Sequence, residues 1–267
     1  MNEFVIKNGV LYKYKGNASN VVIPNGVTKI GCYAFDKCEK LISIDIPSSV
    51  VAIYEGAFKN CTNLKSINIP NSVTFIDEWA FSFCKNLTSI VIPNSVTIIG
   101  FGAFCSCIGL TSIDIPSSVT DICSYAFDEC YCLTRINLPR SINSIGCSVF
   151  NGIRNVKPQY TASGALRAYK AFNRYWQCRG FQYEIGKSFH IEGRRIKCCK
   201  NGFHACQNPL DVFDYYDGDL DYLHFAEVEL SGTMDYEANK VAASDIKIVR
   251  ELTATDLANI YNSMEKE

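Results

Sequence analysis

A short segment in the last third of the chain gathers residue types that can hold a metal ion. Cys198, Cys199, His204 and Cys206 lie close together in the sequence, and thiolates and imidazoles are preferred ligands of zinc. The segment has no two separated Cys-x-x-Cys pairs, so a complete ligand set is not specified. A zinc site and a group of buried cysteines beside one hydrogen-bonded histidine both stay open. We favour the second and expect no cofactor.

The same segment also holds the components of a nucleophilic site. Cys199 or Cys206 beside His204, with an acid supplied by Glu227 or Glu229, matches the composition of a cysteine activated by a base. The spacing does not establish that these side chains meet in space. The sequence therefore leaves enzymatic activity undecided, and we favour a role without catalysis.

Charge divides this part of the chain into two stretches. From Lys157 to Lys200 there are ten Lys and Arg against two acids, and from Asn201 to Asp245 there are ten acids against one Lys. Cations interleaved with aromatic residues in the first stretch can bind single-stranded nucleic acid through phosphate pairing and base stacking. Alternatively, strands from the two stretches pair and neutralise each other, and we favour this interpretation.

The whole chain has the composition of an ordinary globular protein. Its 267 residues are 48% hydrophobic and 20% charged, enough for one long domain or two modest ones. A net charge of -1 argues against a globally electrostatic partner such as duplex nucleic acid. No apolar run approaches the roughly 20 residues that span a bilayer, and the N-terminal residues do not resemble a secretory signal. We therefore expect no membrane contact and a cytoplasmic location.

The first half of the chain repeats one phrase every 23 residues. An Ile-Pro or Leu-Pro pair marks six units, which begin at Ile23, Ile46, Ile69, Ile92, Ile115 and Leu138. A second column at the same period is Phe35, Phe58, Phe81, Phe104, Phe127 and Phe150. A period of about 20 to 50 residues is typical of stacked units, each of which buries its apolar face only against a neighbour. The repeated residues should lie inside and the varied ones outside.

Spacing within one unit predicts its local structure. Leu-x-Ser-Ile-x-Ile alternates with period two and indicates a short strand, whereas Ala-Phe-x-x-Cys-x-x-Leu has the spacing of a short α or 3₁₀ helix. The cysteines at this position are Cys38, Cys61, Cys84, Cys107 and Cys130. We expect them to be free thiols that fill the interior, because a ladder of identical thiols offers no closed tetrahedral metal site.

The repeated phrase Ile-Pro-x-x-Val-x-x-Ile-x-x-x-Ala-Phe-x-x-Cys-x-x-Leu-x-x-Ile closely resembles the BspA-type leucine-rich repeat over about residues 20–157. Residues 4–14 resemble the N-terminal cap of such arrays, with Asn8 and Gly9 forming a hairpin turn. The resemblance implies a solenoid that recognises proteins or surfaces rather than one that performs chemistry.

The period is lost after Phe150. The pattern predicts a capping helix over Thr161–Phe172, with Ser163 near its start. Strands are predicted in "FQYEIGKSFHIEG", "RRIKCC", "LHFAEVEL" and "KVAASDIKIVREL", and helices in "NPLDVFDYY" and "TATDLANIYNSMEKE". The predicted fold class is therefore α+β: a leucine-rich-repeat solenoid of six 23-residue repeats with an N-terminal hairpin cap over 1–157, then a capping helix and small α+β domain over 158–267.

The C-terminal segment carries a second resemblance. "YKAF", "CRGFQYEIGKSF" and "CKNGFHACQNPLDVFDYY" resemble an uncharacterised domain of bacteriophage proteins that is sometimes joined to BspA-type repeats. This implies a phage-encoded protein acting inside an infected bacterium. The layout of Arg179-Gly180 and Glu227-x-Glu229 is also similar to that of ADP-ribosyltransferases, although their Ser-Thr-Ser element is missing. If the domain is an enzyme, the resemblance and the histidine chemistry point to Arg179, His204 and Glu229.

Large apolar residues interrupt the polar varied columns in two central repeats. They are Phe75, Trp79, Phe83, Val91, Ile98 and Phe101. Exposed aromatic residues framed by polar ones are typical of binding hot spots, although the same residues can pack against one another or under the second domain. Our leading hypothesis is a non-enzymatic protein-protein interaction module, phage-encoded, that binds and inhibits a host defence factor. The alternative is a nucleotide- or nucleic-acid-processing C-terminal domain, for example ADP-ribosyltransferase-like, that the repeats target.

Overall fold

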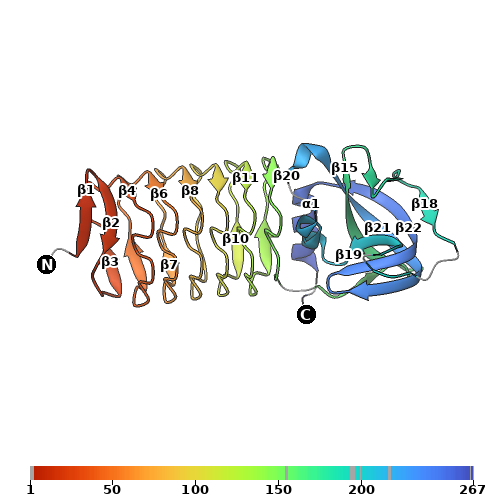
Figure 1. The fold of residues 1–267 in the computed structure, drawn as a ribbon, viewed down its shortest axis with the longest axis horizontal. Helices are drawn as coiled ribbons and strands as arrows, with labels where there is room; N and C mark the ends of the chain where they lie inside the picture. Colours follow the sequence, from red (N-terminus) through yellow and green to blue (C-terminus); the bar gives the residue numbers. More distant parts are fainter. Residues whose placement is uncertain are drawn as a thin grey trace. The chain divides into compact units, whose positions relative to one another are not determined.

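The computed structural model describes residues 3–153, 156–192, 196–198, 200–215, 218–264 and 266. The chain divides into two compact units, Met1–Arg154 and Asn155–Glu267. Figure 1 shows a stack of coils in the first unit and a curved sheet with a helix in the second.

The coils of the first unit contribute short strands to two rows. The first row contains β1 (Phe4–Lys7), β2 (Val10–Tyr14), β4 (Lys29–Ile30), β6 (Ala52–Ile53), β8 (Phe75–Ile76), β9 (Ile98–Ile99), β11 (Asp121–Ile122) and β13 (Ser144–Ile145). The second row consists of two separate sheets, one of β3 (Asn20–Val22), β5 (Ser43–Asp45) and β7 (Ser66–Ile67) and one of β10 (Ser112–Asp114) and β12 (Arg135–Asn137). Neighbouring coils pair in parallel, as Ile53 does with Ile76. The predicted solenoid of stacked repeats is confirmed.

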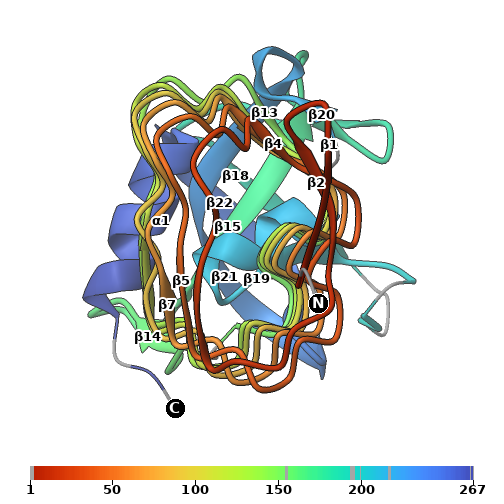
Figure 2. The ribbon, with the colours of Figure 1, turned by 90° about the vertical axis from the view of Figure 1, so that its left-hand side faces the viewer.

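The repeated phenylalanines form one continuous stack inside the coils. Phe35, Phe58 and their successors are at most 1% exposed. Successive rings lie 5.2 to 5.9 Å apart with interplanar angles of 14° or less. At the N-terminal end the β1–β2 hairpin turns at Asn8 and Gly9, both with positive φ, and places Tyr14 on the ring of Phe35 at 5.2 Å. The predicted hairpin cap is confirmed. Figure 2, viewed along the stack, shows the coils superimposed.

The segment between Ala-Phe and Leu is not the predicted helix. Tyr33 and Lys37 have φ values of 55° and 61°, left-handed conformations that a right-handed helix does not contain. The amides of Tyr33, Phe35 and Lys37 donate to carbonyls of the next coil at 2.7 to 2.9 Å, whereas the residues between them donate within their own coil. The spacing of three residues therefore comes from successive tight turns, each of which is also hydrogen-bonded to its neighbour coil.

The cysteine ladder lies inside the stack and has a hydrogen-bonding role. The Cys61 thiol donates to the Phe35 carbonyl of the preceding coil, with a sulfur to oxygen distance of 3.2 Å. The same contact is made by Cys84, Cys107 and Cys130. Burial raises the pKa of each of these four thiols, so they remain protonated donors. The prediction that the ladder fills the interior is confirmed for these four cysteines, whereas Cys38 is half-buried; the cysteines that the structure describes are free thiols.

The second unit is built mainly from strands. They are β14 (Gln159–Tyr160), β15 (Leu166–Asn173), β16 (Gln177–Cys178), β17 (Phe181–Gln182), β18 (Ser188–His190), β19 (Phe203–Cys206), β20 (Gly218–Asp219), β21 (Leu223–Glu237) and β22 (Lys240–Leu252). The helices are η1 (Pro209–Asp214), η2 (Leu220–Tyr222) and α1 (Ala254–Ser263). The predicted strands in "LHFAEVEL" and "KVAASDIKIVREL" and both predicted helices are confirmed.

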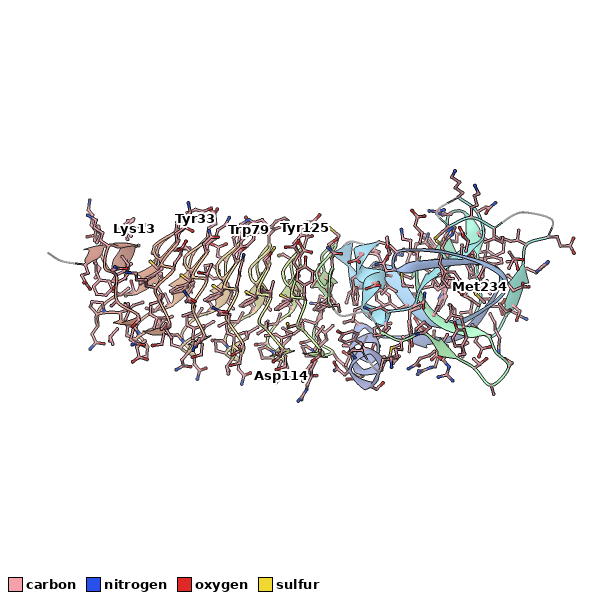
Figure 3. All side chains as sticks on the ribbon, turned by 90° about the horizontal axis from the view of Figure 1, so that it is seen from below. Lys13, Tyr33, Trp79, Asp114, Tyr125 and Met234 are labelled. Atoms are coloured by element: carbon pink, nitrogen blue, oxygen red, sulfur yellow. The ribbon has the colours of Figure 1, made fainter. Side chains whose placement is uncertain are left out.

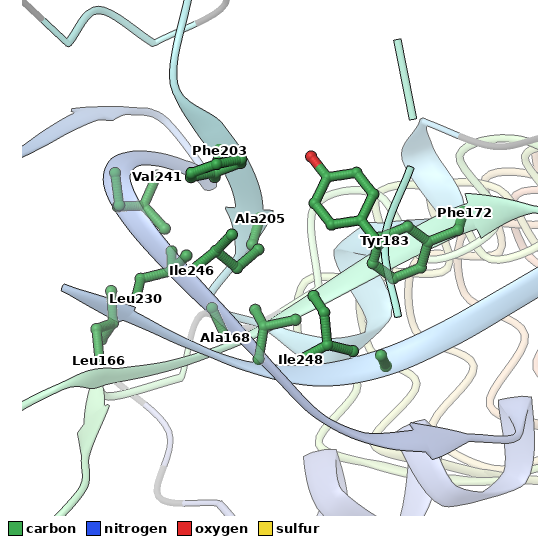
Figure 4. Close-up of a cluster of buried hydrophobic side chains, with 13 residues drawn as sticks. Leu166, Ala168, Phe172, Tyr183, Phe203, Ala205, Leu230, Val241, Ile246 and Ile248 are labelled. Atoms are coloured by element: carbon green, nitrogen blue, oxygen red, sulfur yellow. The ribbon is translucent and has the colours of Figure 1, made fainter. Parts of the chain in front are cut away.

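Four of these strands form a closed circuit. β15 pairs with β21, β21 with β22, β22 with β19, and β19 returns to β15 through one pair, Tyr169 with Cys206. Alternate side chains of β15, namely Leu166, Ala168 and Phe172, belong to the apolar cluster that the circuit encloses, together with residues of the other three strands (Figure 4). The circuit is weakest at the single pair between β15 and β19.

Two local predictions in this unit are wrong. Thr161–Phe172 is not a capping helix, because eight residues of β15 pair in register with β21 and this pairing overrides helical spacing. Ser163 accordingly caps no helix. In "RRIKCC" the described residues Ile196–Cys198 form no strand, and the rest of that segment includes residues outside the described ones.

The predicted pairing of the basic and acidic stretches is confirmed. Arg167 of β15 lies opposite Glu229 of β21, and its Nε is 3.8 Å from Glu227 Oε1. His190 of β18 lies opposite Asp245 of β22, with 2.6 Å between Nδ1 and Oδ1. Some of the basic stretch is therefore engaged by carboxylates within the same sheet.

The phenylalanine stack predicts a large and position-dependent effect of truncation. Phe104→Ala should lower the free energy of unfolding of the repeat unit by about 3 to 5 kcal/mol, since the ring is fully buried between two others. Val91→Ala, at a side chain 73% exposed, should change it by less than about 0.5 kcal/mol. Urea titration followed by circular dichroism measures both, and similar small losses would contradict the stack as the core.

Candidate functional site

The structure places the six predicted partner-binding residues in separate groups. Phe75 and Ile98 face each other in β8 and β9, and Trp79 contacts Phe101 with ring centroids 5.1 Å apart. Val91 lies in the second strand row, bridged to Asn68, and does not join either pair. Phe83 occupies another left-handed turn position, four residues after Trp79.

Phe75 and Ile98 form an outward-facing apolar pair. The Ile98 residue is 43% exposed, and Phe75 is half-buried with its ring 6.1 Å from that of Tyr54. Their neighbours in the same column are Ala52 on one side and Asp121 on the other. The apolar surface of this row is thus limited to the central coils.

Trp79, Phe101 and Tyr125 form a second feature, which we call the aromatic ridge. Phe101 lies between the other two rings, 5.1 Å from Trp79 and 5.2 Å from Tyr125, measured between centroids. The ammonium of Lys59 stands 5.1 Å from the Trp79 ring, within range of a cation–π contact. Figure 3 shows Tyr33, Trp79 and Tyr125 along one edge of the coils. All three ridge rings are half-buried.

Glycine in alternate coils makes room for these rings. Gly102 follows Trp79 by one repeat, has φ of 57°, and a Cβ added to it would lie 2.7 Å from the Trp79 ring. Gly56 has the same relation to Tyr33. Tyr33, Gly56, Trp79, Gly102 and Tyr125 therefore alternate aromatic with glycine at one coil position. Tyr125 is not among the predicted partner-binding residues, although this alternation at a 23-residue spacing marks it in the sequence.

The second unit contains a cavity of about 440 Å³ that brings together two of the three candidate catalytic residues. Arg179 and His204 both line it. Glu229 does not, because it points to another part of the sheet, where its carboxylate is 3.3 Å from Lys247 Nζ. The structure therefore does not assemble the predicted set Arg179, His204 and Glu229, nor does it place Glu229 as an acid for His204.

His204 is partly buried at this cavity and lies near basic side chains. Burial, with the charges of Arg179 and Lys170 as lesser causes, lowers the pKa of His204 to about 4. Its Nε2 is buried and has no hydrogen-bond partner among the residues that the structure describes. Burial also raises the pKa of Cys206 well above its usual range. A neutral imidazole beside a protonated thiol is a poor nucleophile–base pair at neutral pH.

The predicted zinc ligands do not form a metal centre within the described residues. His204 and Cys206 alternate on β19 and both line the cavity. Cys198 instead packs with Ile196 and Ala242, and its amide donates to Asp235. Cys199 lies outside the described residues. In the part of the chain that the structure describes, no group of three or more candidate ligands is placed to hold a metal ion.

Lys170 is a functional candidate that the sequence did not reveal. It lines the cavity and is 5% exposed. It occupies the inward row of β15, between Ala168 and Phe172 of the enclosed cluster. The alternation Leu-x-Ala-x-Lys-x-Phe marks it as a lysine in an apolar row, but only once the segment is recognised as a strand.

Comparison with known proteins agrees with this architecture. The family model described as BspA type leucine-rich repeat region matches residues 5–131 and 76–173, more than half of the chain. The chain belongs to the BspA-type leucine-rich repeat family. A second model, a domain of unknown function (DUF7666), matches residues 166–260. No curated protein matches the chain significantly.

Solved structures resemble part of the chain. A leucine-rich repeat protein of T. pallidum, TpLRR, is 34% identical over 54% of this chain and 69% of its own, with a TM-score of 0.52. A leucine-rich repeat protein of Eubacterium ventriosum is 26% identical over 59% of this chain and 51% of its own, with a TM-score of 0.48. Among the residues described here, no helix has the length and apolarity to cross a membrane.

Gly102→Ala should disturb the aromatic ridge. The added methyl group meets the Trp79 ring at a left-handed position, so we expect a loss of about 1 to 2 kcal/mol in stability and a shift in Trp79 emission. Gly26→Ala is the matched control, because Gly26 also has positive φ but faces open space. All fluorescence variants also carry Trp176→Phe, so that Trp79 is the single tryptophan. An unshifted Trp79 emission in Gly102→Ala would contradict the packing of ring on glycine.

His204 should make the second unit sensitive to acid. Its pKa is about 4 in the folded protein and about 6.5 when unfolded. The unfolded chain therefore binds the extra proton between these values, and stability falls as pH drops from 6.5 to 4. Allowing for partial exposure, we expect a loss of about 1 to 2 kcal/mol. His204→Gln should flatten this fall, while His190→Gln should retain it. Chemical denaturation at several pH values tests both, and an unchanged slope in His204→Gln would contradict the assignment.

Proposed function

We propose that the repeat unit binds a protein partner through the outer surface of its central coils, and that the protein has no catalytic role. Leucine-rich repeat proteins are general protein-interaction modules, and the chain belongs to such a family. The observation that carries the proposal is the apolar pair Phe75 and Ile98 on an otherwise polar or small strand row.

The physical argument is the division between inner and outer residues. Inner columns repeat because each coil must fill the same space, whereas outer columns are free to vary. In the central coils that freedom places apolar groups outward, and the exposed fraction of Ile98 is 43%. Charged Lys29 and Asp121 lie in the same column as this apolar pair. An aliphatic and an aromatic side chain that lose their water at the centre of an interface, with charged residues around them, are typical of a binding hot spot with a polar rim.

The aromatic ridge provides a second contact surface for the same partner. Trp79 and Phe101 lie in the same two coils as Phe75 and Ile98, after the strand in each coil. Aromatic rings lose little conformational entropy on binding because packing already holds them. Each ridge ring is held by a neighbouring ring.

We further propose that the partner is a protein of an infected bacterium. What supports it is the sequence resemblance of the C-terminal segment to a domain of bacteriophage proteins. On this proposal the chain acts in the host cytoplasm and inhibits a host defence factor by binding it.

The proposal is tested by capture with the full-length chain. Phe75→Asp with Ile98→Asp should reduce capture of the specific partner at least about tenfold from a lysate of the encoding organism or, for a phage gene, its host, because each change leaves a desolvated charge in the interface. Val22→Asp with Val51→Asp is the matched control, since both side chains are exposed in earlier coils. Circular dichroism checks folding. Undiminished capture by the first variant would refute the proposed surface.

A further inference from the structure

The cavity of the second unit arises where the circuit of strands opens. β15 and β19 share only the pair Tyr169 with Cys206, and beyond it the strands are no longer paired. The carbonyl of His204, which a continuing ladder would engage, instead accepts a hydrogen bond from the Lys170 ammonium at 2.8 Å. The cavity next to this opening has a volume of about 440 Å³, within the range that small ligands occupy.

Lys170 lies at this opening without a carboxylate partner among the described residues. Its ammonium contacts the Cys178 sulfur at 3.4 Å and stands 5.5 and 5.6 Å from the rings of Phe172 and Tyr183. An ammonium has three protons to donate, and the contacts with the Cys178 sulfur and the His204 carbonyl use two. Burial lowers the pKa of Lys170, and an anion in the cavity that it lines would neutralise and stabilise its charge.

Two further cations line the same cavity. Arg179 stands at the tip of the hairpin between β16 and β17, where Arg179 and Gly180 have φ values of 50° and 75°. The left-handed backbone conformation is unfavourable for arginine. The hairpin adopts it nevertheless, and Arg179 lines the cavity. Lys240 of β22, the strand that pairs with β19, also lines the cavity, and its ammonium is 3.5 Å from the centre of the Tyr215 ring. Neither cation forms an ion pair within the described part of the chain.

Among the described residues that line the cavity, none carries a carboxylate. Asp211 and Asp214 of η1 lie outside it, and burial raises the pKa of Asp211 well above its usual range. The remaining wall is partly apolar and aromatic, with Ala171, Val212 and the rings of Tyr169 and Tyr215, and amides of Asn173 and Gln177 complete it. Three basic side chains and no carboxylate among the described residues thus line one small, partly apolar space.

We propose that this cavity binds a small organic phosphate, a phosphate monoester of about the size of a mononucleotide, with the phosphate at Lys170, Arg179 and Lys240. A phosphate dianion matches several cations better than a single carboxylate does, and arginine and lysine are the usual phosphate ligands. The organic group packs against the apolar wall, and the amides of Asn173 and Gln177 offer it hydrogen bonds. The site lies wholly within the second unit, so it is independent of the partner surface proposed for the repeats.

Isothermal titration calorimetry on the full-length chain tests this proposal, with adenosine monophosphate, adenosine and inorganic phosphate as probes. Adenosine monophosphate should bind one site, inorganic phosphate should compete with it, and adenosine should bind at least about tenfold more weakly, because the charge-assisted hydrogen bonds are lost. Arg179→Gln and Lys240→Gln should each weaken adenosine monophosphate at least about tenfold. Lys187→Gln, which removes an exposed charge outside the cavity, should leave the affinity unchanged.

Several results would overturn the assignment. The absence of adenosine monophosphate binding at millimolar concentration would overturn it. Equal affinity of Arg179→Gln, Lys240→Gln and Lys187→Gln for adenosine monophosphate would also overturn it. Binding of adenosine as tight as that of its phosphate ester removes the phosphate from the proposal, and binding of inorganic phosphate alone removes the organic group. Thermal unfolding of each variant with and without the probe is the second measurement, because a bound ligand raises the unfolding temperature of a protein that still folds.

Discussion

Hydrogen bonds between the backbones of neighbouring coils set the spacing of the coils in the first unit. They occur in both strand rows and again in the turn segment, where every second amide donates to the next coil. Each coil is thereby held at about one strand spacing from the next over much of its circumference. At that spacing a side chain on the inside always meets its own counterpart, so the interior accepts only groups that stack on themselves. Flat phenyl rings, small thiols and branched aliphatic chains satisfy this condition.

This constraint explains how much of the repeat unit is predictable from sequence. The Phe column, the hairpin cap and the strand rows all follow from repetition, since a residue copied six times at one spacing must serve one inner position. The helix predicted after Ala-Phe failed because spacing in sequence does not record the sign of φ. Tyr33, Trp79 and Phe83, which are not glycine or asparagine, occupy left-handed positions that only the contacts between coils stabilise.

In the second unit, which has no repeats, the sequence does not reveal which distant segments pair. Thr161–Phe172 has the spacing of a helix, yet its pairing partner lies in β21, far along the chain. Because the strand was not foreseen, the inward position of Lys170 was not foreseen either. Arg179 and His204 do meet at one cavity, whereas Glu229 lies with Lys247. Which of these residues meet depends on how the circuit of strands closes, and local sequence carries no signal for that closure.

Over five coils, aromatic residues alternate with glycine along one edge, so that this edge has a period of 46 residues, twice that of the core; the series ends at Ser148. Removing one coil would set Tyr33 directly beneath Trp79, with no glycine to receive its ring. Removing two would preserve the alternation. Lineages of this protein should therefore gain and lose repeats in pairs, and the length of the solenoid should change in double steps.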